Sequence, residues 1–330
     1  MDSAHQAVDA HGGIDRGNVV TFMQIVFFGA GGIGGYFGGR LAAAGAQVAF
    51  LARGRHAQAL REQGLRISSP LGDVHLPQVT VAESPADLPK ADLVVFSVKL
   101  PDAEAAAAQL PAVLRPGGVV LPFQNGVDAA ELLARHVGAD AVAQGLAYIA
   151  TRISAPGCIE HGGDFARLRF GPLRPAQEPV LQGFLQACRT AGIDAEMPAD
   201  IRRAVWEKFV FLVGLSGLTA LTRQPVGVVR ADPELRRLLH AVMAEATALG
   251  RAEGVDLPAD YADQRMDFVD TLPHGMKASM LHDLEAGRPL ELPWLAAAVV
   301  RRSAARGLEA PVNRFIAAAL GPYAGGPSGA

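Results

Sequence analysis

The sequence is poor in the residues that build disulfide frameworks and metal sites. Only two cysteines, Cys158 and Cys188, occur in 330 residues, and no C-x-x-C motif is present. The nine histidines are scattered, without the H-E-x-x-H spacing that brings two of them to one face of a helix. We therefore expect no metal site and a reduced compartment, while a pairing of the two cysteines stays open.

Charge of one sign and long apolar runs are also lacking. The formal net charge of -3 and the pI near 6.3 give no positive field for nucleic acid or an anionic membrane. The longest apolar stretch, Phe209–Leu221, is too short to span a bilayer. Residues Met1–Thr21 are polar and lack the apolar core of a secretory signal. These absences predict a cytoplasmic protein that has neither nucleic acid nor a membrane as its partner.

The distribution of strand and helix patterns predicts two domains. A chain of this length exceeds the usual size of one domain, and half of its residues are hydrophobic. Both patterns occur as far as Met197–Asp200, and only helical patterns follow, with Asp200 as the expected cap of the first helix. This predicts an α/β fold with an N-terminal Rossmann domain at 23–199 and an all-helical domain at 200–322. We expect residues 1–22 to form a disordered extension and residues 323–330 a flexible tail.

The chain is organised around a glycine-rich turn. The apolar run Ile25–Phe28 predicts a buried parallel strand, and a G-x-G-x-x-G motif follows it and leads into a helix at Tyr36–Ala44. In such a turn Gly29 permits the tight bend, Gly31 lets the backbone approach a pyrophosphate, and Gly34 allows close helix–strand packing. An ordinary βαβ turn is the alternative interpretation. The predicted cofactor-binding residues of the turn are Gly29, Ala30, Gly31, Gly32, Ile33 and Gly34.

An arginine stands where dinucleotide-binding folds select their cofactor. Folds that choose NAD place an acid about 20 residues after the glycines, where it binds the ribose 2′-hydroxyl, whereas NADP folds place a cation nearby. Here Arg53 holds this place, with Arg55 and His56 close behind, and no acid lies between Gly34 and Glu62. The pattern predicts NADP(H), with an ordinary loop cation as the alternative.

Two further predicted strands are followed by polar side chains. The strand Leu93–Val98 ends at Lys99, and an alanine-rich helix is expected at Pro101–Leu114. The next strand, Val119–Phe123, is followed shortly by Asn125. Residues just beyond the carboxyl ends of such strands face the ligand crevice. The alternatives are a solvated loop lysine and an Asn-Gly turn without further function.

A lysine and a glutamate in the helical region stand beside apolar residues. Lys208 precedes an apolar stretch, and a buried ammonium must find partners or lose its proton. Leu212 and Ser216 follow it at intervals of one turn on the same side of the helix. Glu291, between two leucines, is a candidate half-buried carboxylate that serves Lys208. The alternatives are a lysine that snorkels to water and an acid that only complements a helix dipole.

Taken together, these motifs resemble the ketopantoate (2-dehydropantoate) 2-reductase family. The likeness runs from Met23 to about Leu320 and rests on GAGGIGGYFGGRLAAAG with LARGRHAQALREQGLRI, then FSVK, QNG, WEKF with LTAL, and KASMLHDLEAGRPLEL, in this order. The resemblance implies a Rossmann domain, a helical domain and an active site between them. It also implies reduction of ketopantoate to pantoate by NADPH, with hydride transfer to the 2-oxo carbon, in pantothenate and coenzyme A biosynthesis.

The resemblance implies roles for individual residues at the matching positions. The glycines of the turn hold the pyrophosphate, Arg53 meets the 2′-phosphate, and Lys99 and Asn125 line the cofactor and substrate crevice. Lys208 is the catalytic lysine, and Glu291 is the acid that pairs with both substrate and lysine. The implied substrate-binding residues are Asn125, Ser216, Ser279 and Glu291.

Two positions depart from the family's pattern. Typical members carry asparagines one and two turns after the catalytic lysine, where this chain has Leu212 and Ser216. Because a lost carboxamide changes discrimination among polar substrates, a related NADPH-dependent reductase of a different 2-oxo acid is an alternative. A non-enzymatic NADPH-binding sensor and a dehydrogenase of 3-hydroxy acids or polyol phosphates are two further hypotheses. We expect a monomer or a homodimer with a small 2-oxo acid as its substrate.

Overall fold

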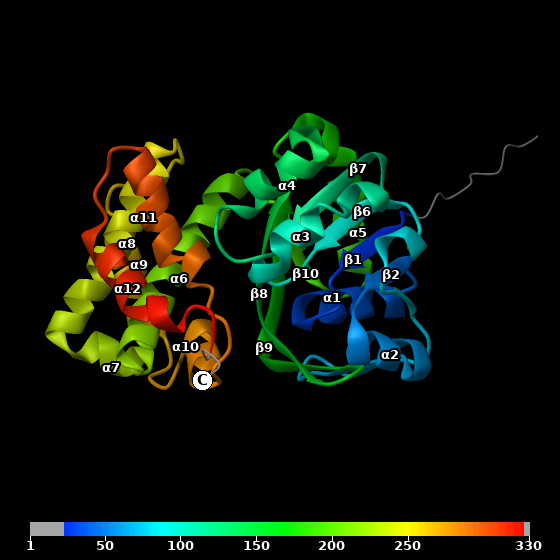
Figure 1. Ribbon diagram of the computed structural model, residues 1–330, viewed down its shortest axis with the longest axis horizontal. Helices are drawn as coiled ribbons and strands as arrows, with labels where there is room; N and C mark the ends of the chain where they lie inside the picture. Colours follow the sequence, from blue (N-terminus) through cyan, green and yellow to red (C-terminus); the bar gives the residue numbers. More distant parts are fainter. Residues whose placement is uncertain (1–22, 327–330) are drawn as a thin grey trace, which may run out of the picture.

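The computed structural model describes residues 23–326, which form two lobes side by side (Figure 1). The expected N-terminal extension at 1–22 and the last part of the expected tail, 327–330, lie outside this range. In the first lobe a parallel sheet has the strand order β5-β2-β1-β6-β7, as in a Rossmann fold. Its strands are β1 (Ile25–Phe28), β2 (Val48–Leu51), β5 (Thr80–Ala82), β6 (Ala91–Phe96) and β7 (Leu114–Pro122).

The central strand is buried on both faces, which explains why its sequence is apolar without alternation. Ile25 and Phe27 belong to one apolar cluster, and Val26 and Phe28 belong to another on the opposite face. The first cluster includes residues of α1 and α5, and the second includes residues of α3 and α4. The helices of this lobe are α1 (Gly32–Ala43), α2 (Gly54–Gln63), α3 (Ala103–Ala107), α4 (Ala129–Val137) and α5 (Glu178–Thr190), with single 3-10 turns at η1 (Pro85–Asp87), η4 (Ala139–Ala141) and η5 (Pro175–Gln177).

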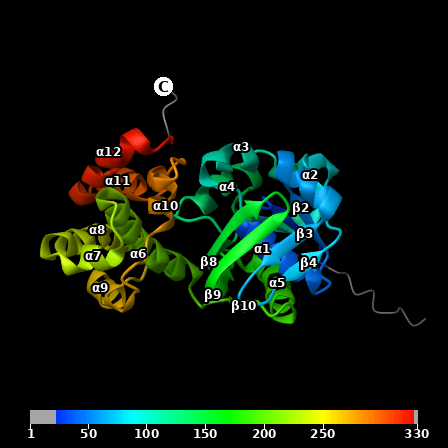
Figure 2. The same cartoon turned by 90° about the horizontal axis from the view of Figure 1, so that it is seen from below.

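A second sheet covers the outer side of α1, with the long hairpin of β8 and β9 across it (Figure 2). The glycines of α1 make this sandwich possible. A Cβ on Gly35 would lie 2.8 Å from Ile159 in the second sheet, and a Cβ on Gly38 would lie 2.5 Å from Phe50 in the first. The glycine-rich helix is therefore a spacer between two sheets as well as the end of a turn. The strands are β3 (Leu65–Ser68), β4 (Val74–Leu76), β8 (Gln144–Ala155), β9 (Cys158–Gly171) and β10 (Asp194–Glu196).

The second lobe is built around one long apolar helix, α6 (Ile201–Thr222), which starts shortly after β10 ends. Asp200 caps it, as the sequence predicts: its carboxylate accepts from the N–H of Arg203 at 2.9 Å. The helix has the length and hydropathy of a membrane span. However, 72% of its most apolar 18-residue stretch is buried inside the lobe, as in a core helix. The others are α7 (Val226–Ala231), α8 (Pro233–Ala252), α9 (Tyr261–Thr271), α10 (Ser279–Glu285), α11 (Ala296–Ala305) and α12 (Pro311–Leu320), with 3-10 turns at η6 (Leu292–Trp294) and η7 (Gly321–Tyr323).

Two expectations differ from the structure, and one open question is answered. The prediction of a single helix at Pro101–Leu114 is wrong, because the segment is divided into η2 (Leu100–Asp102), α3 and η3 (Leu110–Ala112). Pro111 removes a backbone N–H and excludes a helix through this segment. The helix after the glycine turn begins at Gly32, earlier than expected. Cys158 and Cys188 are both free thiols.

Candidate active site

The glycine-rich turn is closed toward the protein and open on its outer side. Gly29 has φ +109°, a backbone conformation that favours glycine. A Cβ on Gly34 would lie 2.0 Å from the carbonyl oxygen of Gly29, so helix and strand approach too closely for any other residue. At Gly31, in contrast, a Cβ would meet no atom within 4 Å. The outer side of the turn therefore has space for a ligand group against the backbone, as a pyrophosphate requires.

The start of α1 suits an anion. The first amides of a helix have no intrahelical acceptor and carry the positive end of its dipole. No acidic residue lies in the first turn of α1. Ala30 is buried and donates to the carbonyl of Leu51 at 3.0 Å, and Ile33 packs partly buried against the core. Gly32 rests on Thr151 of β8, where a Cβ would lie 2.7 Å from Oγ1. These residues form a cradle that fits the phosphates of a dinucleotide.

Arg53 lies exposed at the N-cap of α2, directly after the strand that neighbours β1. Sequence reasoning missed an acid in this area, Glu83, which follows β5 and reaches the end of β2 because the two strands pair. Its carboxylate accepts from the N–H of Gly54 at 3.2 Å and lies 3.5 Å from Nη2 of Arg61. Spacing along the chain cannot reveal a residue that arrives through strand pairing.

His56 connects the glycine turn with the β8–β9 hairpin. Its Nδ1 accepts from the N–H of Gly157 at 3.1 Å, so its Nε2 carries the proton and donates to the carbonyl of Ala30 at 2.9 Å. Only the neutral ring can make both bonds. Burial lowers the pKa of His56, which favours this neutral form.

Three predicted site residues meet where the two lobes face each other. Lys208 of α6 donates from Nζ to Oδ1 of Asn125 at 3.0 Å and to the carbonyl of Ala147 at 2.7 Å. Nδ2 of Asn125 donates to Oε2 of Glu291 at 2.9 Å. The ring of Tyr148 lies below the lysine, with its centroid 5.4 Å from Nζ. The carboxamide of Asn125 thus joins the lysine and the carboxylate into one hydrogen-bonded chain, the relay of Lys208, Asn125 and Glu291.

Burial shifts both charged ends of this relay toward their neutral forms. It lowers the pKa of Lys208 to about 8, and the carboxylate of Glu291 opposes this shift. Burial also raises the pKa of Glu291, against the hydrogen bond from Asn125 and the charges of Lys208 and Lys99. Lys99 itself is exposed at the start of η2. A lysine whose pKa lies near neutrality is suited to give up its proton.

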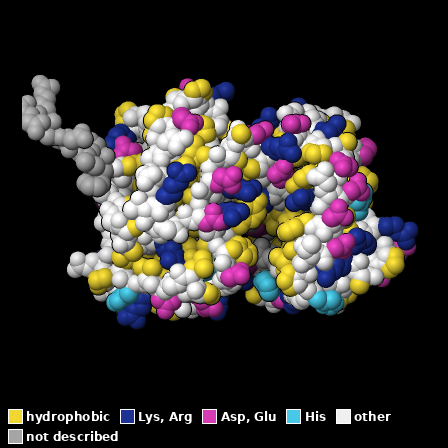
Figure 3. Space-filling model, turned by 180° about the vertical axis from the view of Figure 1, so that it is seen from behind, with side chains coloured by type: hydrophobic (Ala, Val, Ile, Leu, Met, Phe, Trp, Pro, Cys, Tyr) yellow, Lys and Arg dark blue, Asp and Glu magenta, His cyan; other side chains and the backbone are white. Residues whose placement is uncertain are grey.

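A cavity of about 10 Å³ adjoins Lys208 and Asn125, and Leu212 forms part of its wall. Gln124 also lines this cavity. Sequence reasoning missed this residue, although its position directly before Asn125 was a signal that could have found it. Its Nε2 donates to the carbonyl of Val98 at 2.8 Å, and its buried Oε1 has no hydrogen-bond partner within residues 23–326. The cavity lies between the lobes, which Figure 3 shows meeting along a groove.

The two serines lie away from the relay contacts. Ser216 is completely buried in α6, and its hydroxyl has no partner among the residues that the structure describes. Ser279 is exposed at the first position of α10. The structure therefore brings Lys208, Asn125 and Glu291 together and leaves both serines without a hydrogen bond to any of them.

Two family models match the chain. "Ketopantoate reductase PanE/ApbA" matches residues 25–175, and "Ketopantoate reductase PanE/ApbA C terminal" matches residues 200–324. The chain belongs to the ketopantoate reductase family. It is accordingly an oxidoreductase, of a family that acts on small keto acids with nicotinamide cofactors.

Individual members of the ketopantoate reductase family resemble the chain over most of their length. A 2-dehydropantoate 2-reductase of Halobacterium salinarum is 32% identical over 89% of this chain and 97% of its own. The crystal structure of a PanE/ApbA family ketopantoate reductase from Ralstonia eutropha has a TM-score of 0.82 and 32% identity, covering 92% and 98% of the two chains. That of a 2-dehydropantoate 2-reductase from Geobacter metallireducens has a TM-score of 0.83 and 31% identity, covering 91% and 99%.

Proposed function

We propose that the chain is an NADPH-dependent 2-dehydropantoate 2-reductase that reduces ketopantoate to pantoate in the biosynthesis of pantothenate and coenzyme A. The observation that carries the proposal is the relay from Lys208 through Asn125 to Glu291, at a cavity between the lobes. The relatives named 2-dehydropantoate 2-reductase support the substrate. As a biosynthetic enzyme of a small acid, it would work in the cytoplasm as a monomer or homodimer.

The residues of the relay would orient the substrate and supply a proton. The bound nicotinamide supplies the hydride for the 2-oxo carbon. Lys208, as an ammonium, polarises the 2-oxo oxygen and transfers a proton from Nζ to the growing alkoxide. Asn125 holds Nζ in place, and Glu291 stabilises the ammonium and accepts from a substrate hydroxyl. The pKa of about 8 leaves Lys208 largely protonated at neutral pH and makes it a better acid than an exposed lysine.

Arg53 supports NADPH as the cofactor. It is exposed beside the end of β2, where a 2′-phosphate would lie, while Glu83 is engaged by Arg61 and the N–H of Gly54. An arginine can bind a phosphate through two parallel hydrogen bonds. The fold alone does not select the cofactor, since a D-mandelate dehydrogenase structure with NADH has a TM-score of 0.82 at 16% identity.

One observation favours a second candidate function, the reduction of a different 2-oxo acid. Leu212 lines the cavity beside Lys208. The family resemblance places an asparagine here, and a leucine cannot donate to a polar substrate group. A less polar 2-oxo acid would therefore be favoured as a substrate over ketopantoate, whereas the chemistry of Lys208 would be unchanged.

The test is the oxidation of NADPH by the purified protein with ketopantoate and a panel of smaller and larger 2-oxo acids, followed by the absorbance of the reduced cofactor. Preference for ketopantoate supports the proposal, and turnover with another acid alone supports the second candidate. Tight NADPH binding without any turnover would identify a sensor instead. The variant Lys208→Ala tests the role of the lysine, and wild-type turnover by that variant would contradict the role. Its matched control is Lys90→Ala, because the Nζ of Lys90 also donates to a carbonyl at 2.8 Å but on the exposed surface.

A further inference from the structure

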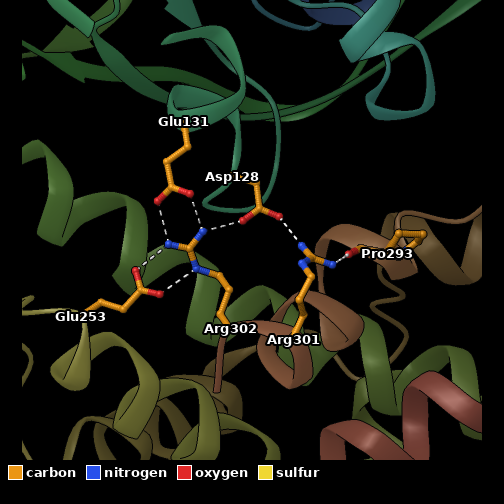
Figure 4. Close-up of polar contacts among 6 residues, drawn as sticks. All are labelled: Asp128, Glu131, Glu253, Pro293, Arg301 and Arg302. Carbon is orange, nitrogen blue, oxygen red and sulfur yellow. Dashed lines mark hydrogen bonds and ion pairs between the residues drawn. The ribbon is translucent and has the colours of Figure 1, made fainter. Parts of the chain in front are cut away.

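Five charged residues form one cluster across the boundary between the lobes (Figure 4). Asp128 and Glu131 belong to the start of α4 in the first lobe, and Glu253, Arg301 and Arg302 belong to the helical lobe. All the ion pairs that join residues 23–199 with residues 200–326 lie in this cluster.

Arg302 is saturated by three carboxylates. It makes two-bond pairs with Glu131, at 2.9 and 2.7 Å, and with Glu253, at 2.7 and 2.7 Å. Its Nη1 also donates to Asp128 at 2.8 Å. A guanidinium has five N–H donors in a fixed fork, and all of them are used here. The side chains of Arg302 and Glu253 are 14% and 5% exposed, so solvent screens this pair little, whereas Glu131 is 63% exposed and its pair with Arg302 is screened more.

Arg301 extends the cluster to the active-site segment of the helical lobe. It donates to Asp128 at 2.7 Å and to the carbonyl of Pro293 at 3.3 Å. Pro293 comes two positions after Glu291, and Asp128 comes three positions after Asn125. The cluster thus ties together the two short segments that carry the Asn125–Glu291 hydrogen bond.

A close backbone contact lies between the Asn125–Glu291 hydrogen bond and the ion pairs of Asp128. Gly126 has φ +92°, and a Cβ there would lie 3.0 Å from the carbonyl oxygen of Trp294. The loop therefore touches the Glu291 segment through the side chain of Asn125 and the backbone of Gly126, and the carboxylate of Asp128 is linked to that segment through Arg301.

We propose that Arg302, assisted by Arg301, is a positioning residue of the active site, which holds Asn125 between Lys208 and Glu291 by fixing Asp128 against the helical lobe. The inference rests on the proposed function, because it assigns a role in the same reaction. Asn125 comes from one lobe and both of its partners come from the other. A displacement of about 1 Å between lobes breaks both hydrogen bonds, and such a misplacement can cost about 100-fold in rate.

The test variant is Asp128→Asn, which keeps the shape of the side chain and removes the charge that both arginines share. We expect kcat to fall about 10- to 100-fold while the Kd for NADPH stays unchanged. In an Asn125→Ala background the same substitution should lower kcat no further than about twofold, because Asp128 acts through Asn125. Arg302→Lys should retain more activity than Arg302→Gln. Asp270→Asn is the matched control, since Asp270 makes a two-bond pair with Arg236 away from the boundary.

A measurement without substrate separates this inference from the proposed function. Labelling of Lys208 by acetic anhydride near pH 8, read by mass spectrometry, reports whether Asn125 still engages Nζ. We expect Asp128→Asn and Asn125→Ala to label several-fold faster than the wild type and Asp270→Asn to label at the wild-type rate. If the wild type reduces no 2-oxo acid but this pattern holds, the proposed function fails and the inference stands. Wild-type labelling of Asp128→Asn, or independent losses of kcat in the double variant, overturns the inference.

Discussion

Asn125 and Glu291 are 166 positions apart in the chain, yet Nδ2 of the first donates to Oε2 of the second at 2.9 Å. The other end of the same carboxamide accepts from Lys208. This orientation is the only one that serves both partners, because the lysine offers donors alone and the ionised carboxylate acceptors alone. The amino group of Lys208 and the carboxylate of Glu291 are thereby held at a fixed separation.

The rate of reduction should fall as the pH rises through about 8. Burial lowers the pKa of Lys208 to about 8, and only its ammonium form can donate a proton. Because an unfolded lysine keeps its proton to about 10.5, the unfolded state binds more protons between these values. The free energy of unfolding contributed by this group therefore rises with pH across that window. A profile of kcat against pH tests the expectation, and a flat profile across about pH 8 would contradict it.

Asn125→Asp should raise the pKa of Lys208 and lower kcat. A carboxylate at this position still accepts from Nζ at about the same distance and favours the ammonium by its charge. It cannot donate to Glu291, so the acid loses its partner. We expect the alkaline fall of the pH profile to move upward. If the alkaline fall stays at the same pH in a variant that folds normally by circular dichroism, Asn125 does not influence the pKa of Lys208.

Arg53→Gln should weaken NADPH much more than NADH. A hydrogen bond to a charged group contributes about 1.5 to 3 kcal/mol, so we expect the KM for NADPH to rise about 10- to 100-fold. The KM for NADH should change less than about twofold, since NADH has no 2′-phosphate. Arg66→Gln, at an exposed arginine of β3, is the control. Equal losses for both cofactors would show that Arg53 does not read the phosphate.

Two alanine substitutions in the glycine turn should have opposite effects. Gly31→Ala meets no protein atom, so we expect near-normal stability and a large loss of cofactor affinity. Gly34→Ala places a Cβ 2.0 Å from the carbonyl oxygen of Gly29, so we expect the free energy of unfolding to fall by about 1 to 3 kcal/mol. Thermal unfolding and NADPH titration measure both properties. Tight binding by a folded Gly31→Ala protein would exclude the turn as a phosphate site.

The stability of the fold should decrease as the pH falls below the ordinary pKa of histidine. The pKa of His56 is lowered from 6.5 by burial, so the unfolded state binds the additional proton first. The contribution of His56 to the free energy of unfolding is present above about pH 6.5 and is lost as the pH falls further. We expect His56→Asn to reduce the difference in Tm between about pH 7.5 and about pH 5.5. His75→Asn, on an exposed strand position, should leave that difference unchanged.

The sequence predicts best where the physical cause is local. The buried strand at Ile25–Phe28, the turn at Gly29 and the cap at Asp200 depend on neighbouring residues, and the structure has all three. The family resemblance pairs Lys208 with Glu291 but does not say how the two side chains are connected. The structure links them through Asn125.

What the sequence could not predict depends on pairing between distant segments. Glu83 approaches the start of α2 only because β5 pairs with β2. Ser216 follows the face of Lys208 by spacing, but it is buried within the helical lobe. Arg302 stands in an ordinary helical pattern, and nothing in that pattern distinguishes it from its neighbours before α4 is placed beside it.

The segment that carries Asn125 packs against both lobes. Phe123 is buried in the apolar cluster of the first lobe, whereas Val127 is buried in that of the helical lobe. Any swing of the lobes must therefore flex the backbone between these two residues, where Gly126 has a left-handed conformation. Asn125 stands inside this hinge, so any swing would loosen its bonds to Lys208 and Glu291, and the ion pairs of Asp128 limit how far the two lobes can part.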